Sequence, residues 1–372
     1  MTPGTSNQAF VDQANGAGNA AGRADLLMRQ AGMMNKINVV QSGNQNTIGL
    51  QEVAPNAGFG VLQASDTVFG TNRTNIIQSS DRNQIGSVSQ IAQGAGLEVV
   101  GNDLMIEQGL ANTSLSDDNR IGTVQQTRIG AVQGNVAVLR QAGGQNIVQK
   151  IAQFATGPGA GTQNRIELLQ QGNGNGTSVL SGRAAEVGAF GGQFIQGSPS
   201  SASHGNQLFL TIFGDGNQAG TVQQGIGNTI GDASAAIISG QNNQLGVLQS
   251  GLENRLSVLV LGDENNIGAR QVGVGNSIAA SVALGGTDNN FLLEQVGSDN
   301  QAVVSVTGDL NAVSLLQDGL GNVSMFSTIG NQNAISGKQS GSVNLATVSQ
   351  NGNLNIATFS QHGGFNSIAI NQ

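Results

Sequence analysis

The sequence is poor in the residues that usually build the core of a large enzyme. It contains no cysteine, tryptophan or tyrosine, and only 4 prolines and 12 phenylalanines among 372 residues. Aromatic side chains supply much of the buried area of globular cores, so this chain must bury thin layers of Val, Ile, Leu and Ala instead. The lack of cysteine excludes disulfides, thiol catalysis and thiolate metal sites.

Charge is also scarce. The chain has 14 Lys and Arg against 22 Asp and Glu, which gives a formal net charge of -8. This supply of cations does not provide the basic stripe that binds a phosphate backbone, so nucleic acid is not expected as a partner. No apolar run reaches about 18 residues, and no membrane span is expected. Residues 1–5 do not resemble a signal peptide, so secretion would require a signal already removed or another export route.

The sequence has a repeat in place of these features. From Asn300 to Asn366 an Asn recurs every 11 residues, a Gly stands three positions before each, and a Gln often stands five before. The same phase recurs upstream, interrupted by register slips. Because Pro55, Pro158 and Pro199 lie within slips and Pro cannot donate to a strand ladder, we interpret the slips as loop insertions. They fall near residues 47–71, 84–134, 147–163, 176–205, 229–242 and 277–288.

Each unit alternates with period two. After Asn344, Ala346 and Val348 share one face with Gln350, while Thr347 lies on the other. This alternation predicts a strand with one buried face. Two 11-residue half-repeats make a strand–turn–strand rung of about 22 residues. We therefore predict an all-β fold, a cross-β two-sheet β-solenoid of about 14 to 16 rungs. Residues 26–372 would form one repeat solenoid, preceded by a tail or poorly repetitive segment at 1–25.

The same parity places Gln and Asn side chains inward. A buried amide without a partner costs about 1–3 kcal/mol, but stacked copies can pair with each other along a ladder. Glycine would supply the turns between strands. The predicted stacking-ladder and turn residues are Gln30, Gly32, Asn35, Gln41, Gly43, Asn46, Gln249, Gly251, Asn254, Gln271, Gly273, Asn276, Gln295, Gly297, Asn300, Gln317, Gly319, Asn322, Gln339, Gly341, Asn344, Gln350, Gly352, Asn355, Gln361, Gly363, Asn366 and Gln372.

This pattern resembles the repeat of the curlin family, Ser-x5-Gln-x-Gly-x2-Asn-x-Ala-x3-Gln. Two successive units, Gln339 to Gln350 and Gln350 to Gln361, match its Gln-to-Gln part in full. Near the other end, Gln30 to Gln41 matches with Ile37 in place of Ala. The resemblance covers most of residues 30–372.

The resemblance implies a secreted subunit that polymerises with itself into curli-like functional amyloid fibres at the cell surface. Such fibres form biofilm matrix and mediate adhesion. It also implies two partners, a nucleator subunit and an outer-membrane secretion apparatus. The chain departs from the family in its length, in its insertions and in the rarity of the leading Ser. These departures leave open whether it is a major subunit, a nucleator or a more distant fibre-forming relative.

No constellation of catalytic residues is evident. His204 and His362 lack neighbouring Ser/Asp or Cys partners and are predicted to be exposed turn residues. Asp215, Asp263 and Asp309 are interpreted as solvated turn acids, because the repeated calcium β-roll pattern is missing. A charged group is interpreted as a polar loop and comprises Asp103, Glu107, Asp117, Asp118 and Arg120. We predict no enzymatic activity, no metal and no cofactor.

The function predicted from the sequence is structural. The last unit would offer an open strand edge to the next subunit. This polymerisation edge comprises Asn366, Ile368, Ile370 and Gln372. Deleting residues 355–372, or placing Pro at Ile368, is predicted to weaken polymerisation. The alternative is a monomeric β-solenoid that serves as an adhesin or as a surface-binding protein.

Overall fold

The computed structural model is almost entirely β, with 64% strand and 2% helix. It describes residues 7–14, 16–22, 27–32, 34–49, 59–65, 71–94, 101–109, 117–130, 132–157, 161–231 and 236–372. The chain divides into two compact units. Unit 1 comprises residues 1–177 and 192–207, and unit 2 comprises residues 178–191 and 208–372.

Unit 1 contains two sheets of parallel strands. The strand order of sheet A is β1 (Gln8–Gln13), β4 (Lys36–Gln41), β7 (Arg73–Gln78), β9 (Asp103–Gln108), β11 (Val136–Ala142) and β13 (Arg165–Gln171). The order of sheet B is β2 (Ala20–Ala21), β5 (Thr47–Ile48), β8 (Gln84–Gln93), β10 (Arg120–Gly130), β12 (Ile147–Gly157) and β14 (Gln193–Gln196). Two further strands join sheet B through β8, namely β3 (Leu27–Ala31) and β6 (Phe59–Ser65).

Unit 2 repeats this arrangement. Its sheet A contains β15 (Gln207–Phe213), β17 (Thr229–Ile230), β18 (Ala236–Ser239), β20 (Arg255–Leu261), β22 (Ser277–Val282), β24 (Gln301–Thr307), β26 (Val323–Ile329), β28 (Leu345–Asn351) and β30 (Ser367–Asn371). Its sheet B contains β16 (Gln218–Ile226), β19 (Gln244–Leu252), β21 (Asn266–Val274), β23 (Asn290–Ser298), β25 (Ala312–Leu320), β27 (Ala334–Ser342) and β29 (Ile356–Gly364). A short helix, α1 (Gly182–Glu186), also belongs to this unit.

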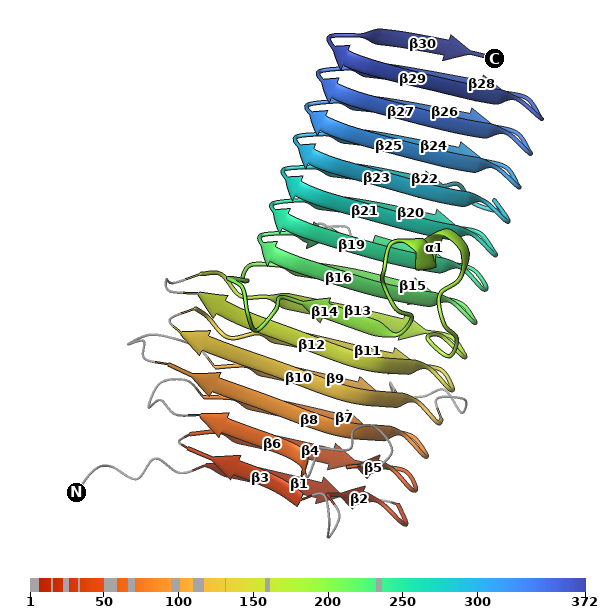
Figure 1. The fold of residues 1–372 in the computed structure, drawn as a ribbon. Coiled ribbons are helices and arrows are strands. Elements are labelled where there is room, and N and C mark those ends of the chain that lie inside the picture. The colour runs from red at the N-terminus through yellow and green to blue at the C-terminus, as the bar shows by residue number, and fades with distance from the viewer. Residues whose placement is uncertain are drawn as a thin grey trace. The chain divides into compact units, whose positions relative to one another are not determined.

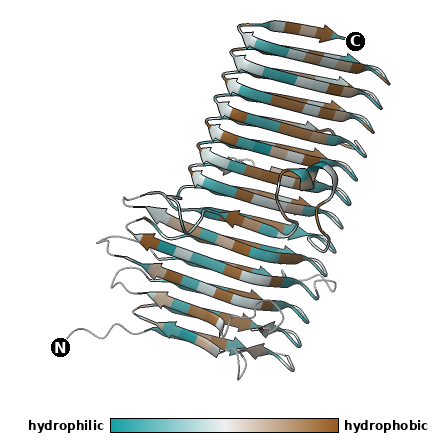
Figure 2. Ribbon diagram, viewed as in Figure 1, coloured by the Kyte–Doolittle hydropathy of each residue, from teal (hydrophilic) through white to brown (hydrophobic). Residues whose placement is uncertain are grey.

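Within each unit, the chain alternates between the two sheets and pairs each strand with the equivalent strand of the next turn. The pairing is parallel and keeps like residues together, as between Val313 of β25 and Ile335 of β27. Within each unit, Figure 1 shows the resulting stack of strands, and Figure 2 shows hydropathy changing in short steps along each one. Each unit is therefore a β-solenoid, and the predicted fold class is confirmed.

The core is a thin layer of aliphatic side chains between the two sheets. Strand β24 shows the pattern, because Ala302, Val304 and Val306 are buried while the residues between them are exposed. A slip of one residue would exchange the buried and exposed sets along the whole strand. The hydrophobic alternation therefore fixes the register of each turn.

The structure corrects two sequence-based expectations. Part of segment 1–25 is regular, because β1 pairs with β4 and β2 pairs with β5. The supposed insertion 84–134 contains β8, β9 and β10, and places Asp103 and Glu107 on a strand instead of in a polar loop.

A local change of spacing explains why the 84–134 range was misread. In sheet A of unit 1, Asn72 precedes Gln78 by six residues, whereas in sheet B, Asn83 precedes Gln90 by seven. The additional residue shifts the 11-residue phase and leaves the strand intact. The 11-residue phase is therefore lost here because the spacing between Asn and Gln changes, while the strands themselves remain.

Candidate functional site

Inward-facing glutamines form continuous hydrogen-bonded columns. In unit 2, Gln317 Nε2 donates to Gln339 Oε1 at 2.9 Å and Gln339 Nε2 donates to Gln361 Oε1 at 2.8 Å. The second hydrogen of each amide goes to the backbone, as from Gln317 Nε2 to the carbonyl of Asn322 at 3.0 Å. Gln317 and Gln339 are fully buried, so these bonds offset a desolvation cost of about 1–3 kcal/mol per unpaired group.

Asparagines at the strand entrances form a second kind of column with the opposite direction. Asn344 donates both its backbone N–H, at 3.1 Å, and its Nδ2, at 2.9 Å, to Oδ1 of Asn322 in the preceding turn. Its Nδ2 also donates to the carbonyl of Gly363 in the following turn, at 3.0 Å. Each asparagine thus links three turns, whereas each glutamine side chain donates towards the C-terminal turn.

Glycines form the third column, at the turns. The predicted turn glycines have φ values between +85° and +132°, a region that favours glycine. At most of these positions space excludes a side chain as well, since a Cβ on Gly297 would lie 2.1 Å from the carbonyl oxygen of Gly319. At Gly352 and Gly363 a Cβ would meet nothing nearer than 3.5 Å and 3.8 Å. The predicted turn glycines are Gly32, Gly43, Gly251, Gly273, Gly297, Gly319, Gly341, Gly352 and Gly363.

The structure places the predicted ladder residues in two sheets. Sheet B of unit 1 holds Gln30, and sheet A of unit 1 holds Asn35 and Gln41, which donates to Gln78 at 2.7 Å. Asn46 enters sheet B of unit 1. The remaining predicted ladder residues lie in unit 2, and the glutamines among them that lie in sheet B are Gln249, Gln271, Gln295, Gln317, Gln339 and Gln361. The asparagines that enter the unit 2 strands are Asn254, Asn276, Asn300, Asn322, Asn344, Asn355 and Asn366.

Several ladder residues of unit 1 were missed by the sequence analysis. They are Gln63, Gln78, Gln90, Gln108, Gln126, Gln153 and Gln196. Variable connections separate successive ladder glutamines by 27 to 43 residues, so a search with a fixed period of 22 misses them. The distance from each Asn to the following Gln, six residues in sheet A and seven in sheet B, is the signal that would have found most of them.

Sheet A of unit 2 interrupts its glutamine column. The positions in register with Gln350 on the preceding strands carry no glutamine. In chain order they are Ile212, Ile238, Val260, Val282, Val306 and Thr328. The column returns at Gln350, which donates to Gln372 Oε1 at 2.9 Å. The last turns of unit 2 thus carry glutamine in both sheets, as the turns of unit 1 do.

The turn acids act as hydrogen-bond acceptors within the solenoid. Asp263 Oδ1 accepts the backbone N–H of Gln241 at 2.7 Å, and Asp309 Oδ1 accepts that of Thr287 at 2.9 Å. In unit 1, Asp81 accepts the N–H of Asn44 at 2.6 Å, and this hydrogen bond lowers the pKa of Asp81. Among the described residues, no group of three His, Cys, Asp or Glu side chains is placed to hold a metal ion.

The two histidines lie in different surroundings. His362 is exposed, as expected, but it lies within strand β29 and not in a turn. His204 is only partly exposed, packs beside Gly161, and has a buried Nδ1 without a hydrogen-bond partner. The expectation of an exposed turn residue is therefore wrong for His204, because the loop that carries it folds back and forms an antiparallel bridge between Ser203 and Thr156.

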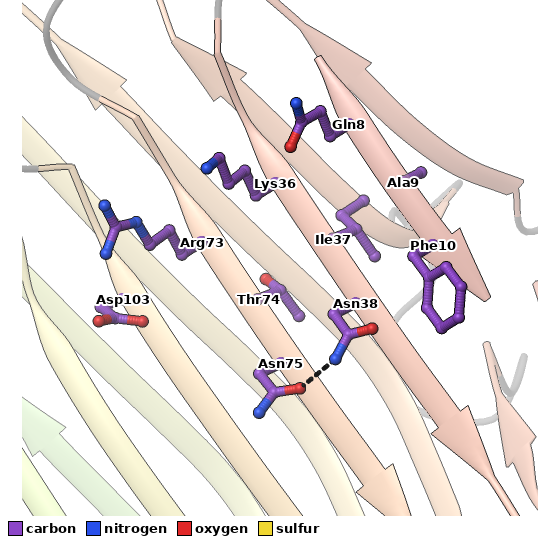
Figure 3. A pocket seen from close by; sticks show the side chains of 10 residues that line it. All are labelled: Gln8, Ala9, Phe10, Lys36, Ile37, Asn38, Arg73, Thr74, Asn75 and Asp103. Carbon is purple, nitrogen blue, oxygen red and sulfur yellow. Dashed lines mark hydrogen bonds between the residues drawn. The ribbon is translucent and has the colours of Figure 1, made fainter. Parts of the chain in front are cut away.

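Unit 1 has a shallow hollow on the outer face of sheet A. Its volume is about 420 Å³, and its lining includes Phe10, Lys36, Arg73 and Asp103. Figure 3 shows these side chains with the amide pair in which Asn38 Nδ2 donates to Asn75 Oδ1 at 2.8 Å. The hollow combines charge, amide and one exposed aromatic ring. Its lining residues show no arrangement of an acid, a base and a nucleophile.

Two sequence comparisons found no match. The chain matches no protein-family model. No curated protein has a significantly similar sequence. Within the described ranges, no helix is long and apolar enough to cross a membrane.

Proposed function

We propose that the chain is a structural subunit that adds end to end to further copies of itself and so builds extracellular curli-like amyloid fibres. The observation that carries this proposal is the pair of amide columns, which run from turn to turn and reach the last strands of unit 2. Among the described residues, β29 and β30 pair with a strand on one side only. An edge of this kind is a template for another strand.

The last turn also contains a side-chain donor that is unpaired, although an equivalent donor in an earlier turn forms a hydrogen bond. Asn333 Nδ2 donates to the carbonyl of Gly352, one turn further, at 2.8 Å. The equivalent Asn355 Nδ2 is buried without a partner. A following turn supplied by another copy would offer a glycine carbonyl at this position, which makes strand addition favourable by the cost of that unpaired group, about 1–3 kcal/mol.

The direction of the glutamine columns makes the proposed contact head-to-tail, because one end of the subunit offers donors and the other offers acceptors. Glutamine amides donate towards later turns, so Gln372 in sheet A and Gln361 in sheet B present donors outward. Gln13 and Gln30 begin the columns of the corresponding sheets in unit 1 and donate to Gln41 and Gln63. Their Oε1 atoms are the acceptors that a preceding turn would use. The C-terminal edge of one copy therefore complements the N-terminal edge of the next.

The wider role rests on the resemblance to curlin repeats. A nucleator subunit and an outer-membrane secretion apparatus would be the partners, and the fibres would contribute to biofilm matrix and adhesion. The role is non-enzymatic, without a cofactor. Self-association is the part of the proposal that the purified chain can test directly.

The sharpest test blocks the outward side of β30 without disturbing its inner side. Gln372 N–H donates inward to Ser349 at 2.9 Å, so alternation directs the N–H groups of Ala369 and Asn371 outward. Ala369→Pro removes an outward donor at a position where an edge strand tolerates proline. Ile368→Pro would instead remove a donor that faces β28. Ala369→Val is the control, because it keeps the N–H.

The measurement is a time course with thioflavin fluorescence and electron microscopy, with and without seeds. The parent chain and Ala369→Val should form unbranched, seedable fibres with a meridional reflection near 4.8 Å, and Ala369→Pro should elongate at least tenfold more slowly. Equal growth of Ala369→Pro would exclude this edge. A β-rich monomer that never elongates, even with seeds, would favour the alternative of a monomeric adhesin or surface-binding solenoid, for which the hollow beside Phe10 is the candidate contact.

A further inference from the structure

A segment of unit 2 lies across the outer face of sheet B. This segment, residues 178–191, is called the flap and contains α1. Helix α1 contacts β19, β21 and β23, and Figure 1 shows it outside the stacked strands. Leu180, Ala184 and Val187 of the flap are buried, and Leu248 and Leu292 of the sheet pack against this cluster. The flap is therefore a packed element and not a loose connection.

The strands beneath the flap are built to receive it. Gly220, Gly246 and Gly268 are in register on successive strands and form a furrow on the outer face. A Cβ on Gly246 would lie 1.8 Å from the carbonyl oxygen of Ala184, and one on Gly268 would lie 2.1 Å from that of Arg183. None of these glycines has a positive φ, so close approach of the flap, not backbone conformation, accounts for them.

A column of amides anchors the flap backbone beside the furrow. Gln218 Oε1 accepts the N–H of Ser178 at 3.0 Å, and Gln244 Oε1 accepts that of Ser181 at 2.7 Å. On the next strand, Asn266 Oδ1 accepts the N–H of Ala184 at 2.7 Å, and its Nδ2 donates to the carbonyl of Ser181 at 2.9 Å. One amide side chain from each of three successive strands thus accepts a backbone N–H from the flap, at positions three residues apart.

The residue type along the furrow column changes where the flap ends. In register with Gly268, the furrow column continues as Leu292 and then as Ser314, Ser336 and Thr358. Glycine and leucine lie under or beside the flap, and hydroxyl side chains lie beyond it. Identical small side chains on parallel, in-register strands form the dry faces of paired β-sheets.

We propose that the flap guards a lateral self-association surface, and that the face beneath it pairs with the same face of a second copy when the flap lifts. The charges beside the furrow favour a second copy as the occupant. Arg270 and Glu294 lie on adjacent strands, 3.7 Å apart. A two-fold axis would place Arg270 of each copy against Glu294 of the other, which is the self-complementarity that an isologous dimer requires. This contact is on the side of the solenoid and does not depend on end-to-end addition.

The principal variant lifts the flap and leaves the sheet unchanged. Leu180→Asp combined with Ala184→Glu buries two carboxylates in the docked state and should release the flap. Because the chain has no cysteine, a single Ser314→Cys substitution next to the furrow reports contact between two such faces, and Ser305→Cys on sheet A is the matched control. Copies joined end to end cannot bring two Ser314 positions together, so the readout distinguishes lateral pairing from fibre growth.

The experiment combines hydrogen exchange with cross-linking by a short bis-maleimide. The double variant should exchange the amides of residues 178–191 at least tenfold faster and should cross-link through Ser314→Cys, but not Ser305→Cys, at least fivefold more than the flap-closed chain. A synthetic peptide of residues 177–191 should suppress that cross-link. Gly246→Val also displaces the flap but fills the furrow, so it should exchange quickly without cross-linking.

Two results would overturn the proposal. One is a flap that exchanges quickly while Ser314→Cys cross-links no more than the flap-closed chain. The other is unchanged protection of residues 178–191 in both the double variant and Gly246→Val, which would mean that the described contacts do not hold the flap. Either result would leave end-to-end growth, tested separately at Ala369, unaffected.

Discussion

Gln350 is paired in register with Thr328, and its side-chain oxygen is buried without a hydrogen-bond partner. In the neighbouring sheet, the equivalent oxygen of Gln339 accepts from Gln317. Threonine is too short to supply the amide that the column uses elsewhere. Gln350 therefore begins a glutamine column instead of continuing one, and it bears the cost of the first position.

Thr328→Gln is expected to move the start of the column by one turn without raising the stability of unit 2. The new Nε2 would donate to Gln350 Oε1, but the new Oε1 would lie opposite Val306 without a donor. Denaturant unfolding and exchange of the amides in β26 and β28 would measure the change. Thr328→Val is the control, since it resembles Val306 and leaves Gln350 Oε1 unpaired. A gain of about 1 kcal/mol in Thr328→Gln alone would contradict the view that the first member of a column always bears this cost.

Gly297 and Gly321 separate two causes of glycine preference. Both have positive φ, at +106° and +63°, but a Cβ on Gly321 would meet nothing nearer than Val343 at 3.9 Å, whereas one on Gly297 would collide with Gly319. Gly321→Ala should cost about 1 kcal/mol for its backbone conformation. Gly297→Ala should cost about 3 kcal/mol or more, because the turns must also separate. Similar unfolding midpoints for the two variants would contradict the steric argument.

Val343 is a β-branched residue with φ of +55° and is exposed at a turn. This conformation costs a residue with a Cβ about 1–2 kcal/mol, while glycine carries an entropic cost of about 0.5–1 kcal/mol. Val343→Gly should therefore raise stability by up to about 1 kcal/mol. Val323→Gly, at the start of β26, should lower it. Thermal unfolding of both variants tests the sign, and a destabilised Val343→Gly would show that the side chain contributes contacts worth more than the strain.

The turn around Asn44 should loosen in acid. The hydrogen bond from Asn44 lowers the pKa of Asp81 below its usual value, which is about 3.9 for an unperturbed Asp. A lowered folded-state pKa contributes stability above the unfolded-state value, and this contribution is lost as the pH falls through the folded-state value. Exchange of the Asn44 amide should accelerate below about pH 4 relative to Asp81→Asn. An identical pH profile in that variant would contradict the assignment.

Much of the fold could be predicted from the sequence. The side-chain period of two predicts strands with one buried face, and the period of 22 residues predicts that successive turns stack in register. Asn300 to Asn366 lie in turns of equal length, and every strand there was recoverable. The expectation failed in unit 1, where an additional residue between Asn83 and Gln90 changes the phase. It also missed α1, whose five residues are held by the sheet beneath them and carry little helical pattern of their own.

The glutamine columns also restrict how such a sequence can drift. Replacing one glutamine within a column orphans a donor on one side and an acceptor on the other, whereas replacing the last member orphans only one group. Substitutions should therefore spread along a column one turn at a time from an existing boundary, as the uninterrupted aliphatic stretch from Ile212 to Val306 illustrates. Because neighbouring side chains of a column depend on each other for hydrogen bonds, covariation is expected between positions one full turn apart.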